Sequence, residues 1–574
     1  MSQDFQKVLV KDDRLMVTDA VRYAVIKGGS NMTCAQYNAI GSGGASGFTS
    51  NINFNISVPS QETIVSRQAL IKTTLNYRIS GTAVAANNNI FRYGDVDAFG
   101  PFPFHQMVNS SQWTINNNTI SQNTRDILAV LCRIHDKRFL HRYNGMTPTM
   151  FDSYGDYATI PQGALNHPNG GFNRLSLDND LSPRGTLPIS LTAGNNCTAG
   201  GLAVGAGPMD CTISVQVTEP VMVSPFIFAG DEGQGIYGIQ NLNAVYNLDS
   251  TANTAIRLSA DATSIAAFPN GRTVTFLGAQ EPQLLLQFLT PHPSDLMPSR
   301  NVVPYYELPR FVSSSGTTVA TGVKHVFNSS SLQLNQIPDK IYICVSKDVS
   351  TRANTDADAF LAINSITMNW NNSAGLLSSA TQQDLWRMSV ENGINMSWVE
   401  FSGSAGGGSA SPVQTSGSVL CLEFGKDIEL KDDYYAPGSL GNFQLQFTVT
   451  ATNTSAVDAT QLQLLTIVQN SGVFSIERGV SSSYLGILTK SDVLEASRGV
   501  PIAYSDALRM VGGGVVGDFF KSVASKLGDA GKDIVKELAP VAKELAIGAI
   551  KKKAGLGMSG AGKRDMGALE DRMY

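Results

Sequence analysis

The chain has 574 residues, of which 42% are hydrophobic and 16% charged, with 54 glycines and 23 prolines. This composition excludes an intrinsically disordered chain, because such chains are poor in apolar residues. Charged residues usually make up about a quarter of a globular protein, so the shortfall predicts that neighbouring subunits or loops cover much of the surface. The length predicts about two to four domains.

The formal net charge of −5 gives no overall positive field that would attract nucleic acid. Residues 514–574 differ from the rest, because they hold 11 lysines and arginines against 8 aspartates and glutamates, a net +3. Taking this +3 from the total leaves −8 on residues 1–513. Any basic segment that faces a membrane or the interior of a shell must therefore be this tail.

The cysteines and the amino-terminal residues indicate the compartment. The six cysteines lie far apart, with no Cys-x-x-Cys pair: Cys34, Cys132, Cys197, Cys211, Cys344 and Cys421. This spacing excludes a zinc ribbon and argues against a disulfide framework in so long a chain. The start MSQDFQKVLVKDDRLM mixes acids and bases where a signal peptide needs an apolar core, and no run of 18 apolar residues occurs. We expect a chain made in the cytosol with reduced, mostly buried thiols.

In the first half, apolar residues alternate with polar ones, which is typical of strands with one buried face. In the first such strand Ile52, Phe54, Ile56 and Val58 face the core. The pattern returns at 71–79, 113–120, 212–218, 272–277 and 283–289. Long loops rich in Gly, Asn and Pro lie between the strands, above all at 143–211.

The second half repeats this pattern, with strands predicted at 341–345, 365–370, 418–424, 443–451 and 461–468. Two successive sets of strands predict an all-β protein of two sandwiches. Five prolines within 289–310 argue against regular structure there, so we place the domain boundary near residue 295. The expected parts are an N-terminal arm (1–45), two sandwiches (46–295 and 296–500), a Gly-rich linker (501–513) and a tail (514–574).

Two short helices interrupt the strands. One begins near Asn123, with Asp126 three residues later, and the other has Thr381-x-x-Asp384 as its N-terminal cap. We expect both helices to pack on loops and to carry no catalytic residue.

The tail is predicted to form a short amphipathic helical segment. Apolar residues follow helical spacing from Phe519 to Leu545, lysines occupy the other faces, and Pro540 would kink the helix. Such a basic segment suits a membrane surface, another protein or the interior of a shell. A flexible solvated tail remains the alternative.

The chain offers no constellation for catalysis. It lacks G-x-S-x-G, H-E-x-x-H and EF-hand motifs, and its six histidines are scattered. His135, Asp136 and His141 lie in a basic run that suits a surface or an interface better than a metal site. Asp95/Asp97 and Asp178/Asp180 have the spacing of calcium ligands without the rest of a calcium loop, so we expect ordinary turns. We expect no catalytic residue, no cofactor and no metal ligand.

One motif resembles a phosphate-binding loop. Gly557, Gly562 and Lys563 have its spacing, but Arg564 replaces the Ser or Thr that would bind magnesium, and no strand precedes the motif. We therefore expect no nucleotide to bind there.

Segments spread over about residues 25–490 resemble, in the expected order, the major capsid proteins of Polinton-like viruses and adintoviruses. These proteins belong to the double jelly-roll lineage that also includes adenovirus hexons. The segments are GGSNMTCAQYNA (28–39), NINFNISVPSQETIVSRQALIKTTLNYRISG (51–81), FPFHQMVNSSQWTINNNTIS (102–121), GIYGIQNLN (235–243), SLQLNQIPDKIYICV (331–345), NWNNSAGLLSSATQQDLWRMSVENG (369–393) and LEFGKDIEL (422–430).

The resemblance implies two tandem eight-stranded antiparallel jelly rolls in a structural subunit of a DNA virus. Three such chains form a pseudo-hexagonal capsomer that tiles an icosahedral shell. The implied partners are the chain itself, neighbouring capsomers, penton and minor capsid proteins, and packaged DNA or a membrane at the tail. The implied location is the virion capsid, after synthesis in the host cytosol, and the long loop 143–211 is the candidate for an outward tower.

The resemblance also implies processing by a viral maturation protease. Proteases of this type favour a large aliphatic residue followed by x-Gly-Gly or x-Gly-x-Gly. Two segments of the tail fit: Met510, Gly512, Gly513 and Gly514, and Met558, Gly560, Ala561 and Gly562. A plain flexible hinge and terminus is the alternative.

Two other functions remain open from the residues alone. A coat protein of an RNA virus would commonly have a strongly basic arm, whereas this amino terminus is near neutral. A receptor- or carbohydrate-binding β-sandwich would need a stacking platform, and the chain has only 4 tryptophans.

Overall fold

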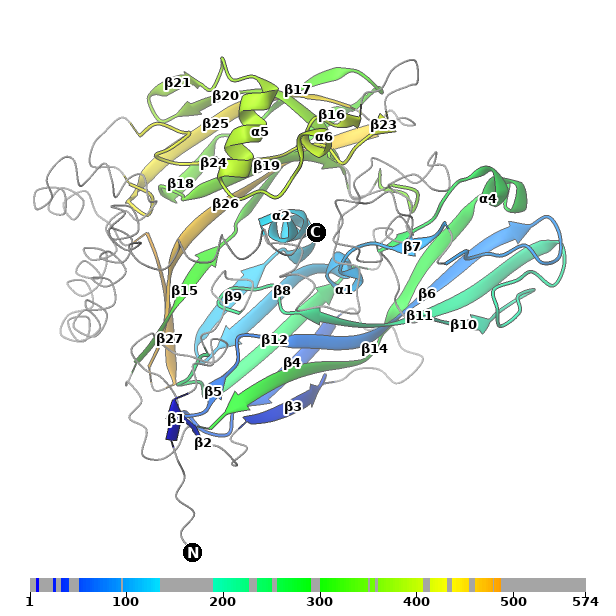
Figure 1. The fold of residues 1–574 in the computed structure, drawn as a ribbon, viewed down its shortest axis with the longest axis horizontal. Coiled ribbons are helices and arrows are strands. Elements are labelled where there is room, and N and C mark those ends of the chain that lie inside the picture. Colours follow the sequence, from blue (N-terminus) through cyan, green and yellow to red (C-terminus); the bar gives the residue numbers. More distant parts are fainter. Residues whose placement is uncertain are drawn as a thin grey trace, which may run out of the picture.

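The structure is a computed structural model of the chain. It describes residues 7–9, 24–26, 32–40, 51–93, 96–134, 189–226, 235–249, 255–290, 300–348, 351–356, 360–405, 413–430, 436–453, 460–477 and 479–486. Strands dominate these residues and form two sandwiches, one above the other in Figure 1. The all-β double jelly roll expected from the sequence is confirmed.

The first sandwich has two antiparallel sheets. The larger has the order β10–β11–β6–β14–β3, with β5 also paired to β14, and the smaller has the order β4–β12–β8–β9. The strands of the larger sheet are β3 (Met32–Asn38), β5 (Ile64–Val65), β6 (Leu70–Ala83), β10 (Ile189–Ala193), β11 (Gly207–Pro220) and β14 (Arg272–Leu289). Those of the smaller sheet are β4 (Asn51–Ser57), β8 (Val108–Ile115), β9 (Asn118–Gln122) and β12 (Asn241–Leu248).

The second sandwich also has two antiparallel sheets. In one, β15, β16, β19 and β27 all pair with β26, and β24 pairs with β19; in the other, β17, β18 and β20 pair with β25, and β21 pairs with β20. The first sheet contains β15 (Arg300–Glu307), β16 (Arg310–Val319), β19 (Lys340–Lys347), β24 (Val419–Glu423), β26 (Thr460–Glu477) and β27 (Val480–Leu485). The second contains β17 (Lys324–Asn328), β18 (Leu332–Gln336), β20 (Ala362–Trp370), β21 (Ser373–Leu376) and β25 (Leu440–Thr452).

Short elements complete the fold. The helices are α1 (Pro103–Met107), α2 (Thr124–Ile134), α4 (Ala262–Ala267), α5 (Gln382–Glu391) and α6 (Trp398–Phe401). The two-stranded pairs are β1 (Lys7–Leu9) with β2 (Ala24–Ile26), β7 (Ala98–Phe99) with β13 (Ile256–Arg257), and β22 (Ser404–Ala405) with β23 (Val413–Gln414).

The two sandwiches follow one plan. In each, a hairpin of the smaller sheet (β8–β9, β20–β21) is followed by a helix (α2, α5) and then by a strand of the larger sheet (β11, β24). The next strand lies in the centre of the smaller sheet (β12, β25), and the plan ends with an 18-residue strand of the larger sheet (β14, β26).

Two hairpin turns repeat this plan in atomic detail. Asn116 and Asn371 both have a left-handed backbone, with φ of 54° and 48°, which asparagine tolerates better than most residues. The side-chain Oδ1 of Asn116 accepts a bond from the N–H of Gln240, and that of Asn371 from the N–H of Gln444, both at 2.8 Å. The sandwiches are therefore two versions of one unit.

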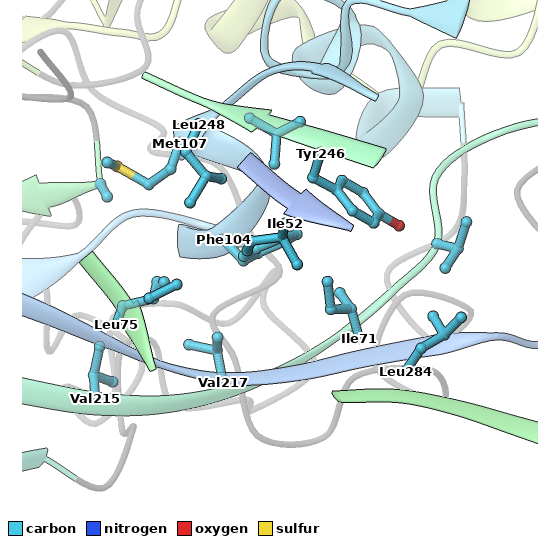
Figure 2. Packing of buried hydrophobic residues seen from close by; sticks show 14 of the residues in the cluster. Ile52, Ile71, Leu75, Phe104, Met107, Val215, Val217, Tyr246, Leu248 and Leu284 are labelled. Atoms are coloured by element: carbon cyan, nitrogen blue, oxygen red, sulfur yellow. The ribbon is translucent and has the colours of Figure 1, made fainter. Parts of the chain in front are cut away.

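The predicted strand phase is confirmed in the first sandwich. Ile52, Phe54 and Ile56 are at most 2% exposed. Figure 2 shows apolar side chains of the smaller sheet facing those of the larger sheet, with Phe104 and Met107 of α1 between them. From the smaller sheet come Ile52, Tyr246 and Leu248, and from the larger come Ile71, Leu75, Val215, Val217 and Leu284.

Four expected segments differ from the structure. The segment 113–120 is a hairpin, because the left-handed Asn116 turns the chain. The segments 272–277 and 283–289 form one strand, β14, with irregular register around Gly278 and before Gln283. The proline-rich segment 289–310 does contain a strand, β15, because Pro304 lies on an edge strand, where a missing N–H is tolerated.

Part of the predicted N-terminal arm belongs to the first sandwich. Strand β3 falls within the predicted N-terminal arm, but it pairs with β14 of the first sandwich. Met32 lies opposite Leu289, and Asn38 lies opposite Gln283. The boundary near residue 295, the linker 501–513 and the tail 514–574 lie outside the described residues.

Candidate functional site: the assembly surfaces

The predicted cleavage motifs lie outside the described residues; they are Met510, Gly512, Gly513, Gly514, Met558, Gly560, Ala561 and Gly562. The same is true of His135, Asp136, His141, Asp95, Asp178 and Asp180, and of the motif that begins at Gly557. Within the described ranges, no group of three His, Cys, Asp or Glu side chains could hold a metal ion. No helix in those ranges is long and apolar enough to cross a membrane.

Asp97, one of the residues considered for calcium, lies in a buried ion pair. Arg272 Nη1 and Nη2 donate to its two carboxylate oxygens at 2.6 and 3.0 Å. The backbone N–H groups of Arg92 and Ser259 donate to the same oxygens at 2.8 and 2.9 Å. Because four donors already surround this carboxylate, it acts as a structural anchor.

This ion pair lies in a projecting part of the first sandwich. Figure 1 shows β6, β10 and β11 running out with α4 beyond the smaller sheet. We call this projection, made of β10, α4 and the adjoining ends of β6, β11 and β14, the ribbon. Asp97 ties together the segment after β6, the segment before α4 and the start of β14. The loop predicted as a tower, 143–211, contributes β10 and the turn that follows it to the ribbon.

Helix α2 lies between the two sandwiches (Figure 1). Its residues Ile127, Leu128, Val130, Leu131 and Cys132 belong to a buried cluster shared with the second sandwich. On the other side of this cluster are Tyr342, Cys344, Val419, Cys421, Leu465 and Ile467 of β19, β24 and β26. The apolar side chains of α2 thus form an apolar contact between the two sandwiches.

Polar contacts fix α2 in this place. Asp126 Oδ2 forms an ion pair with Arg310 Nε at 2.7 Å, and the guanidinium of Arg133 lies 5.0 Å from the ring centre of Phe360. The Arg133 carbonyl accepts the backbone N–H of Asn395 at 2.8 Å. The sequence predicted α2, but the expectation that this helix packs on loops was wrong, because its apolar side chains lie against the strands β19, β24 and β26.

A second junction comes from strands of the second sandwich. The far half of β26, together with β15 and β27, reaches the first sandwich, where Val303, Tyr305, Phe474 and Ile476 join its core. Ser481 donates its N–H to Asn117 Oδ1 at 2.8 Å and its hydroxyl to the Ile115 carbonyl. The two sandwiches therefore share a core as well as a chain.

The outer faces of the smaller sheets are almost free of charge. In the first sandwich Asn55, Asn243, Thr114 and Thr119 lie side by side in register. The other side chains of this face are Asn51, Asn53, Ser57, Ser110, Gln112, Ser121, Asn241, Val245 and Asn247. In the second sandwich the corresponding face has Thr367, Asn369, Gln446, Thr448 and Thr450, with Lys324 at its edge. Such faces suit protein contacts, because the centres of interfaces are depleted of charge.

One buried acid and one buried histidine lie inside the first sandwich. The carboxylate of Glu219 accepts the backbone N–H groups of Phe104 and His105 at 2.8 and 3.0 Å, and His105 Nε2 donates to the Pro220 carbonyl at 2.7 Å. Burial raises the pKa of Glu219 to about 8 and lowers that of His105 to about 4. Because both side chains are at most 1% exposed, they hold α1 on β11 and have no access to a substrate.

The six cysteines are free and five of them are buried, as the sequence predicts. Burial raises the pKa of the Cys344 and Cys421 thiols to about 12. These thiols are therefore unreactive packing residues.

Comparison with known proteins identifies the relatives. Residues 3–289 match the first domain of the Sputnik virophage major capsid protein, and residues 308–472 match the C-terminal domain of major capsid protein V20. The putative capsid protein V20 of Sputnik virophage is 28% identical over 542 residues, which cover 91% of this chain and 86% of that protein.

Two solved structures agree with this result. A chain of the Sputnik virophage structure, determined by cryo-electron microscopy at 3.5 Å resolution, has a TM-score of 0.70 at 27% identity, covering 88% of this chain and 98% of that one. The mavirus major capsid protein crystal structure has a TM-score of 0.67 at 15% identity, covering 83% and 94%, which supports the fold alone.

The two joined jelly rolls and their relatives define a structural subunit of a viral capsid rather than an enzyme. More particularly, the chain belongs to the family of the Sputnik virophage major capsid protein. Its function is that of a major capsid protein, and its place is the virion capsid. The predicted double jelly-roll lineage is confirmed, although the relatives found are virophage proteins and the link to Polinton-like viruses is less direct.

Proposed function

We propose that three copies of the chain form a pseudo-hexagonal capsomer and that these capsomers tile an icosahedral shell. The observation that carries this proposal is the repeated plan of the two sandwiches, since three chains then supply six similar units. The uncharged outer faces of the smaller sheets provide surfaces for contact with neighbouring capsomers and with penton and minor capsid proteins.

Light scattering of the purified full-length chain at micromolar concentration tests the capsomer. We expect the mass of three chains, held by obligate contacts that bury more than about 2,000 Å² in total. A stable monomer under these conditions would contradict the proposal.

We further propose that the tail 514–561 is a detachable segment that a viral maturation protease releases after Gly513 and Ala561. The two motifs flank the amphipathic stretch, and the charge changes from −8 before residue 514 to +3 beyond it. Before cleavage its lysines would contact packaged DNA or the anionic face of a membrane, through weak and salt-sensitive contacts.

Intact-mass spectrometry of chains from mature particles tests this cleavage. A mass corresponding to residues 1–513 is expected. Chains that end at Tyr574 would contradict it and would leave a permanent internal tail.

A further inference from the structure

Helices α2 and α5 occupy the same position in the repeated plan. In both, the first helical bond runs back to the capping residue: Ile127 N–H donates to the Asn123 carbonyl at 3.4 Å, and Leu385 N–H donates to that of Thr381 at 3.0 Å. An aspartate follows three residues after each cap, Asp126 in α2 and Asp384 in α5. Matching the caps therefore aligns the two helices residue by residue.

This alignment pairs buried positions of α2 with more exposed positions of α5. Leu128 and Cys132 of α2, at 1% and 6% exposure, belong to the buried cluster shared with the second sandwich. Their counterparts in α5 are Trp386, which is half-buried, and Val390, which is 41% exposed.

Glu391 of α5 follows the same correspondence. Its counterpart, Arg133 of α2, lies over Phe360 in the second sandwich, whereas the Glu391 side chain is 51% exposed. Trp398 of α6 packs edge-on against Trp386, with ring centres 5.8 Å apart, and extends the apolar surface. The second sandwich thus presents to solvent the surface with which the first sandwich holds its neighbour.

The partner of α2 also has a counterpart. Within the chain, α2 covers the outer face of the sheet that contains β19, β24 and β26, and the equivalent sheet of the first sandwich contains β6, β11 and β14. The outer face of that sheet is mostly neutral, with Thr74, Asn76, Thr212, Ser214, Gln216, Thr218, Thr273 and Thr275. The charged residues of this face are Lys72, Arg78 and Asp210, while α5 carries Asp384 and Glu391, which pair with its own Arg387.

We infer that α5 of one copy packs on the outer face of β6, β11 and β14 in a second copy. This contact repeats between chains the contact that α2 makes within one chain. The contact joins two different surfaces, a helix of one copy and a sheet of the next, and is therefore head-to-tail. Such contacts generate closed rings when the rotation between neighbouring copies closes on itself. The inference rests on the proposed trimer and names the surfaces that hold it together.

A photo-crosslinking residue at position 390 of the full-length chain tests the inference. We expect a two-chain product whose crosslinked peptides map to β6, β11 or β14. A trimer by light scattering whose crosslinks map elsewhere overturns the inference but leaves the trimer intact. A chain that stays monomeric overturns both.

A matched pair of variants gives a second test. Val390→Glu places a charge on the α5 surface, and Val204→Glu places the same charge on the ribbon, where Val204 is 65% exposed. Both valines are exposed, so both variants should fold. We expect Val390→Glu to raise the trimer dissociation constant about tenfold or more, as changes at central contacts do, and Val204→Glu to leave it unchanged. Equal dissociation constants for both variants would overturn the inference.

Discussion

Helices α2 and α5 occupy the same position in the repeated plan of the two sandwiches but differ in how far their side chains are buried. The α2 helix is covered by the second sandwich, and its apolar side chains are buried on nearly every side. In α5, only Leu385 and Ser389 are buried, while Val390 remains 41% exposed. The same position of the repeated unit is thus buried in α2, where another sandwich covers it, and more exposed in α5.

The largest expected effect comes from a change inside one sandwich, before any contact between sandwiches forms. Phe54→Asp buries an unpaired charge beside Tyr246, whose ring lies edge-on at 6.5 Å. The cost should exceed about 5 kcal/mol, which few domains tolerate. Asn55→Asp, on the outer face of the same strand, is the control and should fold. Equal loss of soluble protein from both would show that the strand phase is wrong.

A somewhat smaller effect should separate α2 from α5. Leu128→Glu places a charge in the buried cluster between the sandwiches and should destabilise the chain by about 4 kcal/mol. The aligned change Trp386→Glu alters a half-buried residue of α5 and should leave a folded chain that does not form trimers. Thermal unfolding and light scattering measure the two effects. If Trp386→Glu destabilises the chain as much as Leu128→Glu does, α5 stabilises the fold of one chain, as α2 does, and the proposed difference between the helices is wrong.

The ribbon offers a comparison within the first sandwich. Asp97→Asn leaves Arg272, which is 4% exposed, without its counter-charge and should cost about 3 kcal/mol. Amide hydrogen exchange should speed up in β10, α4 and the start of β14 but not in β19 and β24. Uniform acceleration over both sandwiches would contradict the local role of this ion pair.

The smallest effect concerns pH. Glu219 has a pKa of about 8 in the folded chain against 4.5 ordinarily, so the folded state binds more protons between these values and stability falls as pH rises. His105, with a pKa lowered from 6.5 to about 4, acts oppositely but only below pH 6.5.

Between pH 6.5 and 8 the free energy of unfolding should therefore fall by at most about 1.4 kcal/mol per pH unit. Glu219→Gln should remove this slope, whereas Glu391→Gln, at an exposed site, should keep it. Urea unfolding at several pH values measures both. An unchanged slope in Glu219→Gln would assign the pH dependence to other groups.

The sequence predicted the two sandwiches because alternation of apolar and polar residues is a local signal. It missed the β8–β9 hairpin because Asn116 adopts a left-handed turn inside an otherwise continuous strand pattern. It also missed the strand around Pro304. A proline is tolerated there because the strand lies at the edge of its sheet, and the local sequence does not show that position.

The contacts between the sandwiches were harder to predict. The apolar residues of α2 are Ile127, Leu128, Val130, Leu131 and Cys132, and so wide an apolar surface on a short helix could have indicated burial. The core residues that β15 and β26 supply to the first sandwich depend on how far β26 extends past the residues that pair with β16 and β19. No local pattern determines that length.

The most direct test of the account is a single-particle cryo-electron microscopy reconstruction of the purified full-length chain. We expect a threefold particle with six similar lobes, in which α5 of each copy lies on the outer face of β6, β11 and β14 of the next. A threefold particle in which α5 faces solvent would contradict the equivalence of α2 and α5, and a particle without threefold symmetry would contradict the capsomer itself.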